Sequence, residues 1–238
     1  TVSDIPSLRL MTCSTAPLSP EQWEQFEKMY GVTLLQLYGM SEAGWICGNR
    51  HYKRKMGTVG PPAKHQEFEI ISNEGKICPV GTEGEVSVGG AQTAVATISS
   101  DGLWDDLRGT RIRTGDLAVL DKNGFVQVTG RTKDLIIRGG VNIAPLEIDH
   151  VLMTHPQVRE AAAIGIPDDI YGEEVACYVV AKVGGKIDKD ELVAHCKKTL
   201  PELKVPKKIY IIDQLPKSDR GKVLRDNLKK LWADHTPK

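Results

Sequence analysis

This sequence lacks the patterns that mark several classes of protein. Its 31 basic and 31 acidic residues cancel, so no general attraction to nucleic acid or to a membrane surface is implied. No apolar run approaches the length of a membrane span. The five cysteines are dispersed, without a C-x-x-C pair or metal-ligand spacing, which favours reduced thiols in a cytoplasmic protein. What is present is an ordinary globular composition, long enough for one large or two small domains.

The stretch from Gly130 to Gly140 separates two differently built halves of the chain. It holds a cluster of basic residues bounded by glycines, with Arg131 and Lys133 near its start. Arginine beside glycine suits a phosphate or a sugar-phosphate, because its fork donates several hydrogen bonds and glycine lets a ligand approach the backbone. The simpler alternative to a phosphate-binding site is that this stretch is an exposed basic turn.

The first segment has the pattern of an α/β unit. Leu8–Thr12 and Val32–Tyr38 read as strands, and Ser19-Pro20-Glu21-Gln22 predicts a capped helix that ends at Gly31. We expect the two strands to pair in parallel. Because two parallel strands are too few for a sheet that stands alone, we also expect pairing partners upstream of residue 1.

The second segment reads as short strands joined by glycine turns, which favours a small barrel or sandwich. The expected strands are Glu67–Ile71, Gly84–Val88, Arg111–Thr114, Leu117–Leu120 and Phe125–Thr129. The last two are predicted to form a hairpin in which Asn123-Gly124 supplies positive φ angles.

The third segment alternates helices and strands, which predicts helices packed on a three-stranded sheet. The fold class is therefore mixed α/β and α+β. The expected helices are Pro145–Met153, a capped one from Asp188 to about Thr199, and Val223–Trp232, and the expected strands are Ala161–Ile166, Glu174–Val183 and Lys208–Ile212.

Four stretches, in this order, resemble the superfamily of adenylate-forming enzymes, which comprises AMP-forming acyl-CoA synthetases, peptide-synthetase adenylation domains and beetle luciferases. They are Tyr38-Gly39-Met40-Ser41-Glu42, Arg113-Thr114-Gly115-Asp116, Gly130-Arg131-Thr132-Lys133-Asp134, and Leu215 to Lys222. The resemblance implies that this chain corresponds to the second half of such an enzyme. It divides the chain into the end of an N-terminal α/β subdomain (1–56), a β-barrel-like subdomain (57–130), a hinge (131–134) and a mobile α+β lid (135–238).

The resemblance implies a nucleotide site with ATP or AMP as its ligand. Asp116 matches the carboxylate that accepts the ribose hydroxyls, and Tyr38 matches an aromatic residue beside the adenine. The structural alternative for Asp116 is an aspartate in a turn after a strand, and the alternative for Tyr38 is an aromatic residue of the core. The other implied nucleotide-binding residues are Gly39, Met40, Ser41 and Arg131.

The implied chemistry joins a small carboxylic acid to AMP, which brings two anions together and needs cations near the α-phosphate. Lys222 matches the catalytic lysine, Glu42 the Mg²⁺ ligand and Ser41 a hydroxyl directed at that phosphate. The structural alternative for Lys222 is a solvated lysine in a basic tail. The alternative for Glu42 is a carboxylate at a helix N-terminus, where the helix dipole favours it.

The resemblance also implies domain alternation. Lys133 matches the hinge, and in a second pose the loop Gly139-Gly140-Val141 lines a channel for CoA. The motif around Lys222 resembles sites that a lysine acetyltransferase switches off, because acetylation removes the charge.

The sequence departs from the family pattern near the implied acyl pocket. Ser14-Thr15-Ala16-Pro17 replaces a glycine- and alanine-rich turn, 92–97 lacks a Gly-Tyr-Trp-like segment, and Trp45 follows Gly44. Thr15, Ala16 and Trp45 are the candidate pocket residues. A bulky Trp45 would shorten the pocket and favour a compact or cyclic acid.

We therefore expect the C-terminal portion of an AMP-forming acid–CoA ligase, using ATP, Mg²⁺ and CoA. It would lack the upstream phosphate loop and be inactive by itself. A carrier-protein-loading adenylation domain is the alternative within enzymes. A truncated, non-catalytic nucleotide- or partner-binding module is the alternative outside them. The sequence leaves the acid and the oligomeric state open.

Overall fold

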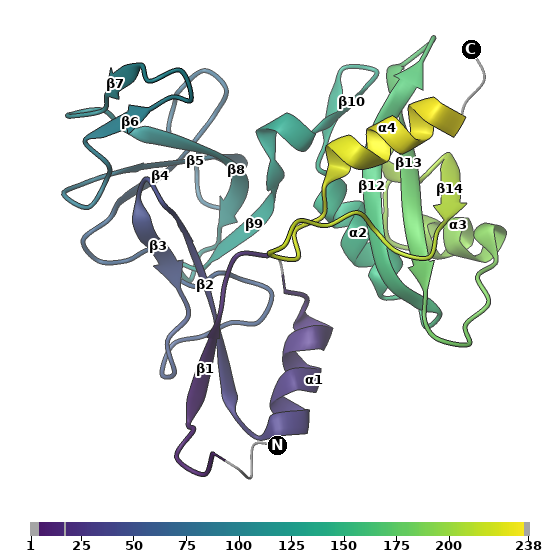
Figure 1. Cartoon of the computed structure of the whole chain (residues 1–238), viewed down its shortest axis with the longest axis horizontal. Helices are drawn as coiled ribbons and strands as arrows, with labels where there is room; N and C mark the ends of the chain where they lie inside the picture. The colour runs from purple at the N-terminus through teal and green to yellow at the C-terminus, as the bar shows by residue number, and fades with distance from the viewer. Residues whose placement is uncertain (1–4, 17, 236–238) are drawn as a thin grey trace. The chain divides into compact units, whose positions relative to one another are not determined.

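The computed structural model describes residues 5–16 and 18–235, and the chain divides into two compact units at Thr129–Gly130. The described residues of unit 1 form three separate β-sheets and the α-helix α1 (Figure 1). Its elements are β1 (Leu10–Cys13), α1 (Pro20–Tyr30), β2 (Thr33–Met40), β3 (Gly44–Gly48), β4 (Glu67–Ile71), β5 (Glu83–Gly89), β6 (Ala96–Ile98), β7 (Trp104–Asp106), β8 (Ile112–Leu120) and β9 (Val126–Arg131). The strand β9 runs across the division between the units.

The predicted strand–helix–strand start of unit 1 is confirmed. The strands β1 and β2 pair in parallel, with Leu10 opposite Thr33. The Ser19 side chain accepts from the Gln22 N–H while the Gln22 side chain accepts from the Ser19 N–H, which completes the capping box, and Gly31 ends α1 at φ 65°. The sequence missed β3, which pairs antiparallel to β2 and gives the order β1-β2-β3.

The expected small barrel is wrong, because the strands β4-β5-β8-β9 form an open sheet among the described residues. Four strands are too few to close around a filled interior, for which about eight are typical. Side chains from this sheet instead share a core with β3, through residues such as Ile46, Val86 and Val126. The two strands expected at 111–120 form one continuous strand, β8. In the hairpin that follows, Gly124 has φ 78° while Asn123 does not have a positive φ.

Unit 2 has one five-stranded sheet rather than the expected three strands, because the glycine loop is itself a hairpin. Four strands pair in the order β11-β10-β13-β12. The fifth strand, β14, pairs in parallel with β13. The elements are η2 (Thr132–Asp134), β10 (Ile136–Arg138), β11 (Val141–Ile143), α2 (Pro145–Met153), β12 (Val158–Asp168), β13 (Gly172–Ala181), α3 (Lys189–Lys197), η3 (Glu202–Lys204), β14 (Lys208–Ile211) and α4 (Arg225–His235).

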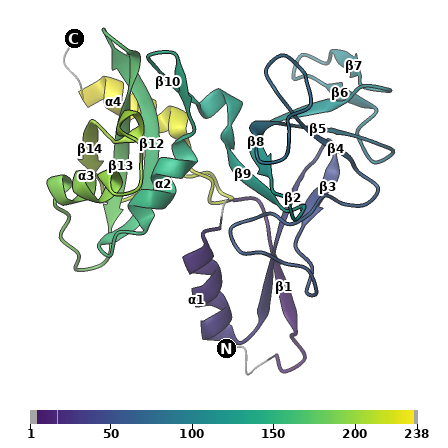
Figure 2. The same ribbon diagram turned by 180° about the vertical axis from the view of Figure 1, so that it is seen from behind.

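Helices cover both faces of this sheet, which explains why its central strands are apolar throughout. Alternate residues of β12 and β13 face opposite sides. Ala163 and Val179 pack with residues of α2 and α3, whereas Ala162 and Tyr178 pack with Leu228 of α4. Figure 1 shows α4 in front of the sheet, and Figure 2 shows α2 and α3 on the opposite face. No helix among residues 5–16 and 18–235 is both long and apolar enough to cross a bilayer.

Candidate active site

The end of β2 and the middle of β8 bring two of the predicted nucleotide-binding residues together. The Tyr38 hydroxyl donates a hydrogen bond to Oδ2 of Asp116 over 2.7 Å, across 78 residues of sequence. Burial and, to a smaller extent, the charge of Asp116 raise the pKa of Tyr38 well above its ordinary value. The phenol therefore stays protonated and remains a donor to the carboxylate.

The backbone around Asp116 is held by side chains of the neighbouring strand β5. Glu85 accepts a hydrogen bond from the Gly115 N–H over 3.0 Å and from Nε of Arg113 over 2.7 Å. The Thr114 hydroxyl accepts from the Asp116 N–H over 3.1 Å and donates to the Val86 carbonyl over 3.1 Å. The sequence indicated the Arg-Thr-Gly-Asp motif, but it gave no role to Glu85 within the stretch Gly84–Gly89 that also resembles the family. The signal was present, since a glutamate in an otherwise buried strand must have a partner.

The strands β2 and β3 approach so closely beside Tyr38 that only glycine fits at position 39. A Cβ added to Gly39 would lie 2.3 Å from the Gly44 carbonyl oxygen. The pairing also shifts register between Tyr38 and Gly39. This bulge re-aims the end of β2, where Met40 is paired with Gly44.

Ser41 and Glu42 lie in the tight turn between β2 and β3, so the alternative of a helix N-terminal carboxylate for Glu42 is wrong. Ser41 is exposed and Glu42 is half-buried. The Ala94 N–H donates to the Glu42 carbonyl over 2.6 Å, and the Gln92 amide donates to the Ala43 carbonyl over 3.2 Å. The segment at 92–97, which departs from the family pattern, therefore holds this turn through one backbone hydrogen bond and one from the Gln92 side chain, and no sequence motif predicts either.

Glu42 offers a hard oxygen ligand, but it is not part of a larger group of metal-binding side chains among the described residues. No group of three or more His, Cys, Asp or Glu side chains able to hold a metal occurs among the described residues. A single carboxylate fits Mg²⁺, which keeps several waters and takes its other ligands from substrate phosphates.

The candidate acyl-pocket residues lie on either side of β2. Thr15 follows β1 and has φ 83°, a left-handed conformation that is a genuine outlier for a β-branched residue. Trp45 lies on β3, where its indole N–H donates to the Cys47 carbonyl over 2.7 Å and its ring lies on Gly48. Ala16 is half-buried, and Pro17 lies outside the described residues.

Lys222 lies on an exposed loop of unit 2 between β14 and α4. A tight turn presents it: the Ser218 N–H donates to the Lys222 carbonyl over 2.8 Å, and Gly221 has φ 77°. The base of the loop is closed by the Leu224 N–H, which donates to the Pro216 carbonyl over 2.9 Å. The Lys222 ammonium group pairs with no residue in the described part of the chain, so it is available to a ligand.

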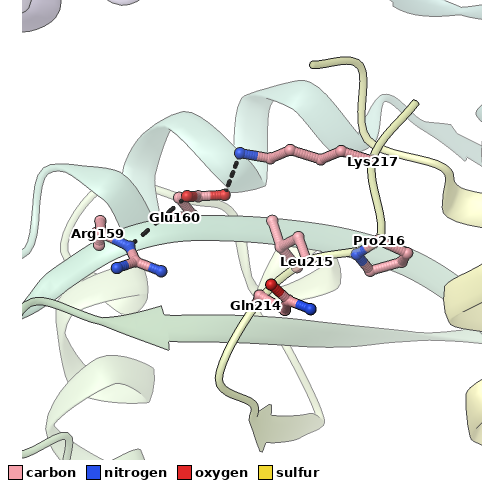
Figure 3. A pocket seen from close by; sticks show the side chains of 6 residues that line it. All are labelled: Arg159, Glu160, Gln214, Leu215, Pro216 and Lys217. Carbon is pink, nitrogen blue, oxygen red and sulfur yellow. Dashed lines mark ion pairs between the residues drawn. The ribbon is translucent and has the colours of Figure 1, made fainter. Parts of the chain in front are cut away.

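A hollow of about 460 Å³ adjoins the same loop. It is lined by Arg159, Glu160, Gln214, Leu215, Pro216 and Lys217 (Figure 3). Figure 3 shows the Glu160 carboxylate between Arg159 and Lys217, and the Lys217 ammonium lies 2.6 Å from it. The pairing neutralises much of the hollow's charge, so we assign it no substrate.

The remaining predicted residues lie at the start of unit 2. Gly139 and Gly140 form the two-residue turn between β10 and β11, with φ 56° and 80°, as a type I′ hairpin turn requires. Val141 is exposed at the start of β11. Lys133 is exposed within η2, and Arg131 is the half-buried last residue of β9.

Comparison with known proteins gives two family matches along the chain. The AMP-binding enzyme family matches residues 1–96, and the AMP-binding enzyme C-terminal domain matches residues 147–222. The chain is 35% identical to the oxalate–CoA ligase of Saccharomyces cerevisiae over 234 residues, which covers 96% of the chain and 43% of that protein.

Solved structures give the same result. ATP-bound MatB from Rhodopseudomonas palustris superposes with a TM-score of 0.87 at 30% identity, covering 98% of this chain and 47% of that one. The anthranilate–CoA ligase AuaEII, in complex with anthranoyl-AMP, superposes with a TM-score of 0.86 at 26% identity, covering 97% and 46%. The chain thus spans just under half the length of the relatives it matches. Two family domains in order along one chain, with these relatives, show that the chain belongs to the adenylate-forming superfamily of AMP-binding enzymes.

Proposed function

We propose that this chain is the C-terminal portion of an AMP-forming carboxylic acid–CoA ligase. The observation that carries the proposal is the contact between Tyr38 and Asp116, which unites two of the family's nucleotide motifs in one site. The proposed reaction has two steps. The acid first displaces pyrophosphate from ATP to give an acyl-adenylate, and the CoA thiol then displaces AMP to give the thioester.

Each residue set has a distinct role in this proposal. Asp116 accepts the ribose hydroxyls, and Tyr38 lies beside the base. Glu42 would hold Mg²⁺, which when bound neutralises phosphate charge. Lys222 brings one positive charge to the acid and the α-phosphate in the first step. Its exposure at a tight turn supports a role that needs a movable cation.

We propose Lys133 as the hinge about which unit 2 changes pose between the two steps. A hinge takes up a large backbone change at a few residues, and an exposed residue in a single 3₁₀ turn meets that need. Gly139, Gly140 and Val141 would then line the path of the CoA thiol, because a Gly-Gly turn leaves room beside the backbone.

The acid is the least determined part of the proposal. The named relatives act on acids as different as oxalate and anthranilate. The indole of Trp45 is fixed against Gly48, which supports a rigid wall and a compact acid. Exchange of Trp45 for alanine should then widen the range of accepted acids, and an unchanged preference among short, aromatic and long-chain acids would contradict this.

The proposal is tested by acid-dependent release of pyrophosphate from the full-length protein across a broad panel of acids. Release with one class of acid, followed by thioester formation on free CoA, is expected. Transfer only to a carrier protein would identify a carrier-loading domain. Nucleotide binding without release of pyrophosphate for any acid would identify a non-catalytic binding module. We expect the 238-residue chain by itself to release none.

Lys222 is also the proposed site of control by a lysine acetyltransferase. Asp219, Arg220 and Gly221, which precede it, are exposed and give a modifying enzyme access. Acetylation would remove the charge needed for adenylation while sparing thioester formation from supplied acyl-AMP. Equal loss of both steps on acetylation would contradict this.

A further inference from the structure

Unit 2 contains two arginine–carboxylate pairs that are almost completely buried. Nη2 of Arg138 lies 2.8 Å from Oε2 of Glu174, with side chains 10% and 5% exposed. Nη2 of Arg225 lies 2.6 Å from Oδ2 of Asp149, with side chains 9% and 5% exposed. Burying two charges costs desolvation energy that their attraction repays poorly. Such pairs are therefore better explained by what they hold in place than by stability.

The Arg138 pair holds the glycine turn between β10 and β11. Arg138 is the last residue of β10, and its Nη1 also donates to the Leu203 carbonyl over 2.9 Å. Its guanidinium stacks on the ring of Tyr171, 4.9 Å from the ring centroid. A rigid planar fork with three partners in different directions allows the end of β10 little freedom.

The residues on either side of Arg138 are held by the same segment of β13 and the turn before it. The Ile137 N–H donates to the Glu173 carboxylate over 2.7 Å, and the Gly139 N–H donates to the Tyr171 carbonyl over 2.8 Å. Three consecutive residues leading into the turn are therefore fixed by the four residues 171–174.

The Arg225 pair holds the loop that presents Lys222. Arg225 is the first residue of α4, three positions after Lys222. Its partner Asp149 lies on α2, and the other oxygen of that carboxylate accepts the Ala163 N–H of β12 over 2.6 Å. The end of the Lys222 loop is thereby tied to both a helix and the sheet.

We propose that these pairs are two independent positioning devices, one for each step of the reaction. Arg138 and Glu174 position the glycine turn for transfer to the thiol, and Arg225 and Asp149 position the Lys222 loop for adenylation. The proposal rests on the function proposed above. The two pairs share no residue and fix different loops, so each can be broken separately.

The test uses Glu174→Gln and Asp149→Asn in the full-length protein, because both changes keep the shape and remove one charge. Each step is measured by itself: pyrophosphate release from acid and ATP, and thioester formation from supplied acyl-AMP and CoA. Glu174→Gln should lower kcat/KM for CoA about 10²-fold, the loss typical of a misplacement near 1 Å, with adenylation unchanged. Asp149→Asn should lower adenylation by a similar factor and leave thioester formation unchanged.

The matched control is Glu160→Gln on β12, which breaks the partly exposed ion pair with Lys217 of the Lys222 loop. Ion pairs that solvent reaches contribute little, so both steps should stay within about threefold of the wild type.

Amide hydrogen exchange on the 238-residue chain supplies a readout besides activity. Glu174→Gln should speed exchange at residues 137–141 and leave 218–224 unchanged, and Asp149→Asn should do the reverse. The proposal is overturned if either variant slows both steps equally, or if exchange rises throughout unit 2, since both results indicate loss of the fold. If the wild type performs neither step, the proposed function fails, while the exchange pattern still decides whether the two loops are held separately.

Discussion

The two units hold the residues proposed to act in the reaction in contrasting ways. In unit 1, Tyr38 and Asp116 are already in contact, and the Asp116 backbone is held through Glu85 and Thr114. In unit 2, Lys222 is exposed on a loop, and only the loop's end is anchored by buried charge. A preformed site suits a ligand that is bound throughout the reaction. A free cation on an anchored loop suits a group that is needed in one step only.

The largest expected effect comes from removing the free cation. Lys222→Ala should slow adenylation about 10²–10³-fold, the loss typical of a single group that stabilises developing charge. Thioester formation from supplied acyl-AMP should stay near the wild-type rate, because the lysine is proposed to act in the first step alone. Measured on the full-length protein, equal losses in both steps would mean that Lys222 is structural. Lys230→Ala, an exposed lysine on α4, is the control.

The buried anchor of unit 2 should show itself as a pH effect. Burial raises the pKa of Asp149 to about 6, against the opposing effects of Arg225 and the Ala163 N–H. The folded chain then binds more protons than the unfolded chain between about pH 4 and 6, so ionisation of Asp149 lowers the free energy of unfolding as pH rises. Asp149→Asn cannot ionise, so it removes this loss of stability with rising pH.

The stability of Asp149→Asn relative to the wild type should therefore improve by up to about 3 kcal/mol from pH 4 to pH 7. Denaturant unfolding of the 238-residue chain at several pH values measures this difference. A relative stability that worsens with rising pH would show instead that Arg225 holds the Asp149 pKa below its ordinary value.

The support of the preformed site can be weakened without touching Asp116 itself. Glu85→Ala leaves the Gly115 N–H and the Arg113 guanidinium without their buried acceptor, at a cost of about 1–3 kcal/mol in the free energy of unfolding. The affinity of the Glu85→Ala variant for AMP should fall together with its stability. Loss of stability with unchanged AMP affinity would mean that Glu85 supports the sheet and not the site. Glu83→Ala, an exposed residue on the same strand, is the control.

The Tyr38 hydroxyl can be removed with little change of shape. Tyr38→Phe deletes one hydrogen bond to Asp116 and should weaken AMP binding by roughly 1 kcal/mol, about fivefold. The ring remains for stacking, so complete loss of binding is not expected. Unchanged AMP affinity would indicate that the ribose replaces the phenol as the partner of Asp116.

The smallest expected effect is at the strained turn after β1. Thr15→Gly removes a β-branched side chain from a left-handed conformation and should raise the free energy of unfolding by up to about 1 kcal/mol. If the strain serves the acyl pocket, preference among acids should weaken in the same variant. A less stable variant would show that the Thr15 side chain makes contacts that outweigh the strain.

Local signals in the sequence predicted much of the fold. The capping box at Ser19 and Gln22 gave the start of α1, Pro145 gave the start of α2, and apolar runs gave β12 and β13. The barrel was wrong because closure depends on strand number and pairing, which strand propensity does not contain. The hairpin of β10 and β11 was missed because each strand has three residues, too few to show a period.

The site could be predicted only as separate motifs. The sequence named Tyr38 and Asp116, but their contact depends on how β2 and β8 meet across 78 positions. Glu85, Gln92, Glu174 and Asp149 were missed because each acts through a partner distant in sequence. A charged residue in a buried strand or helix indicates that a partner exists without saying which residue it is.

We propose that AMP binds chiefly through Asp116 of unit 1 and that Lys222 contributes to reaction and not to binding. Calorimetric titration of AMP into the 238-residue chain, with Asp116→Asn and Lys222→Ala alongside, tests it most directly. The account predicts that Asp116→Asn weakens AMP binding at least about tenfold, as expected for a lost charge-assisted hydrogen bond, and that Lys222→Ala leaves the affinity unchanged. Equal weakening by the two variants, or full affinity in Asp116→Asn, would contradict it.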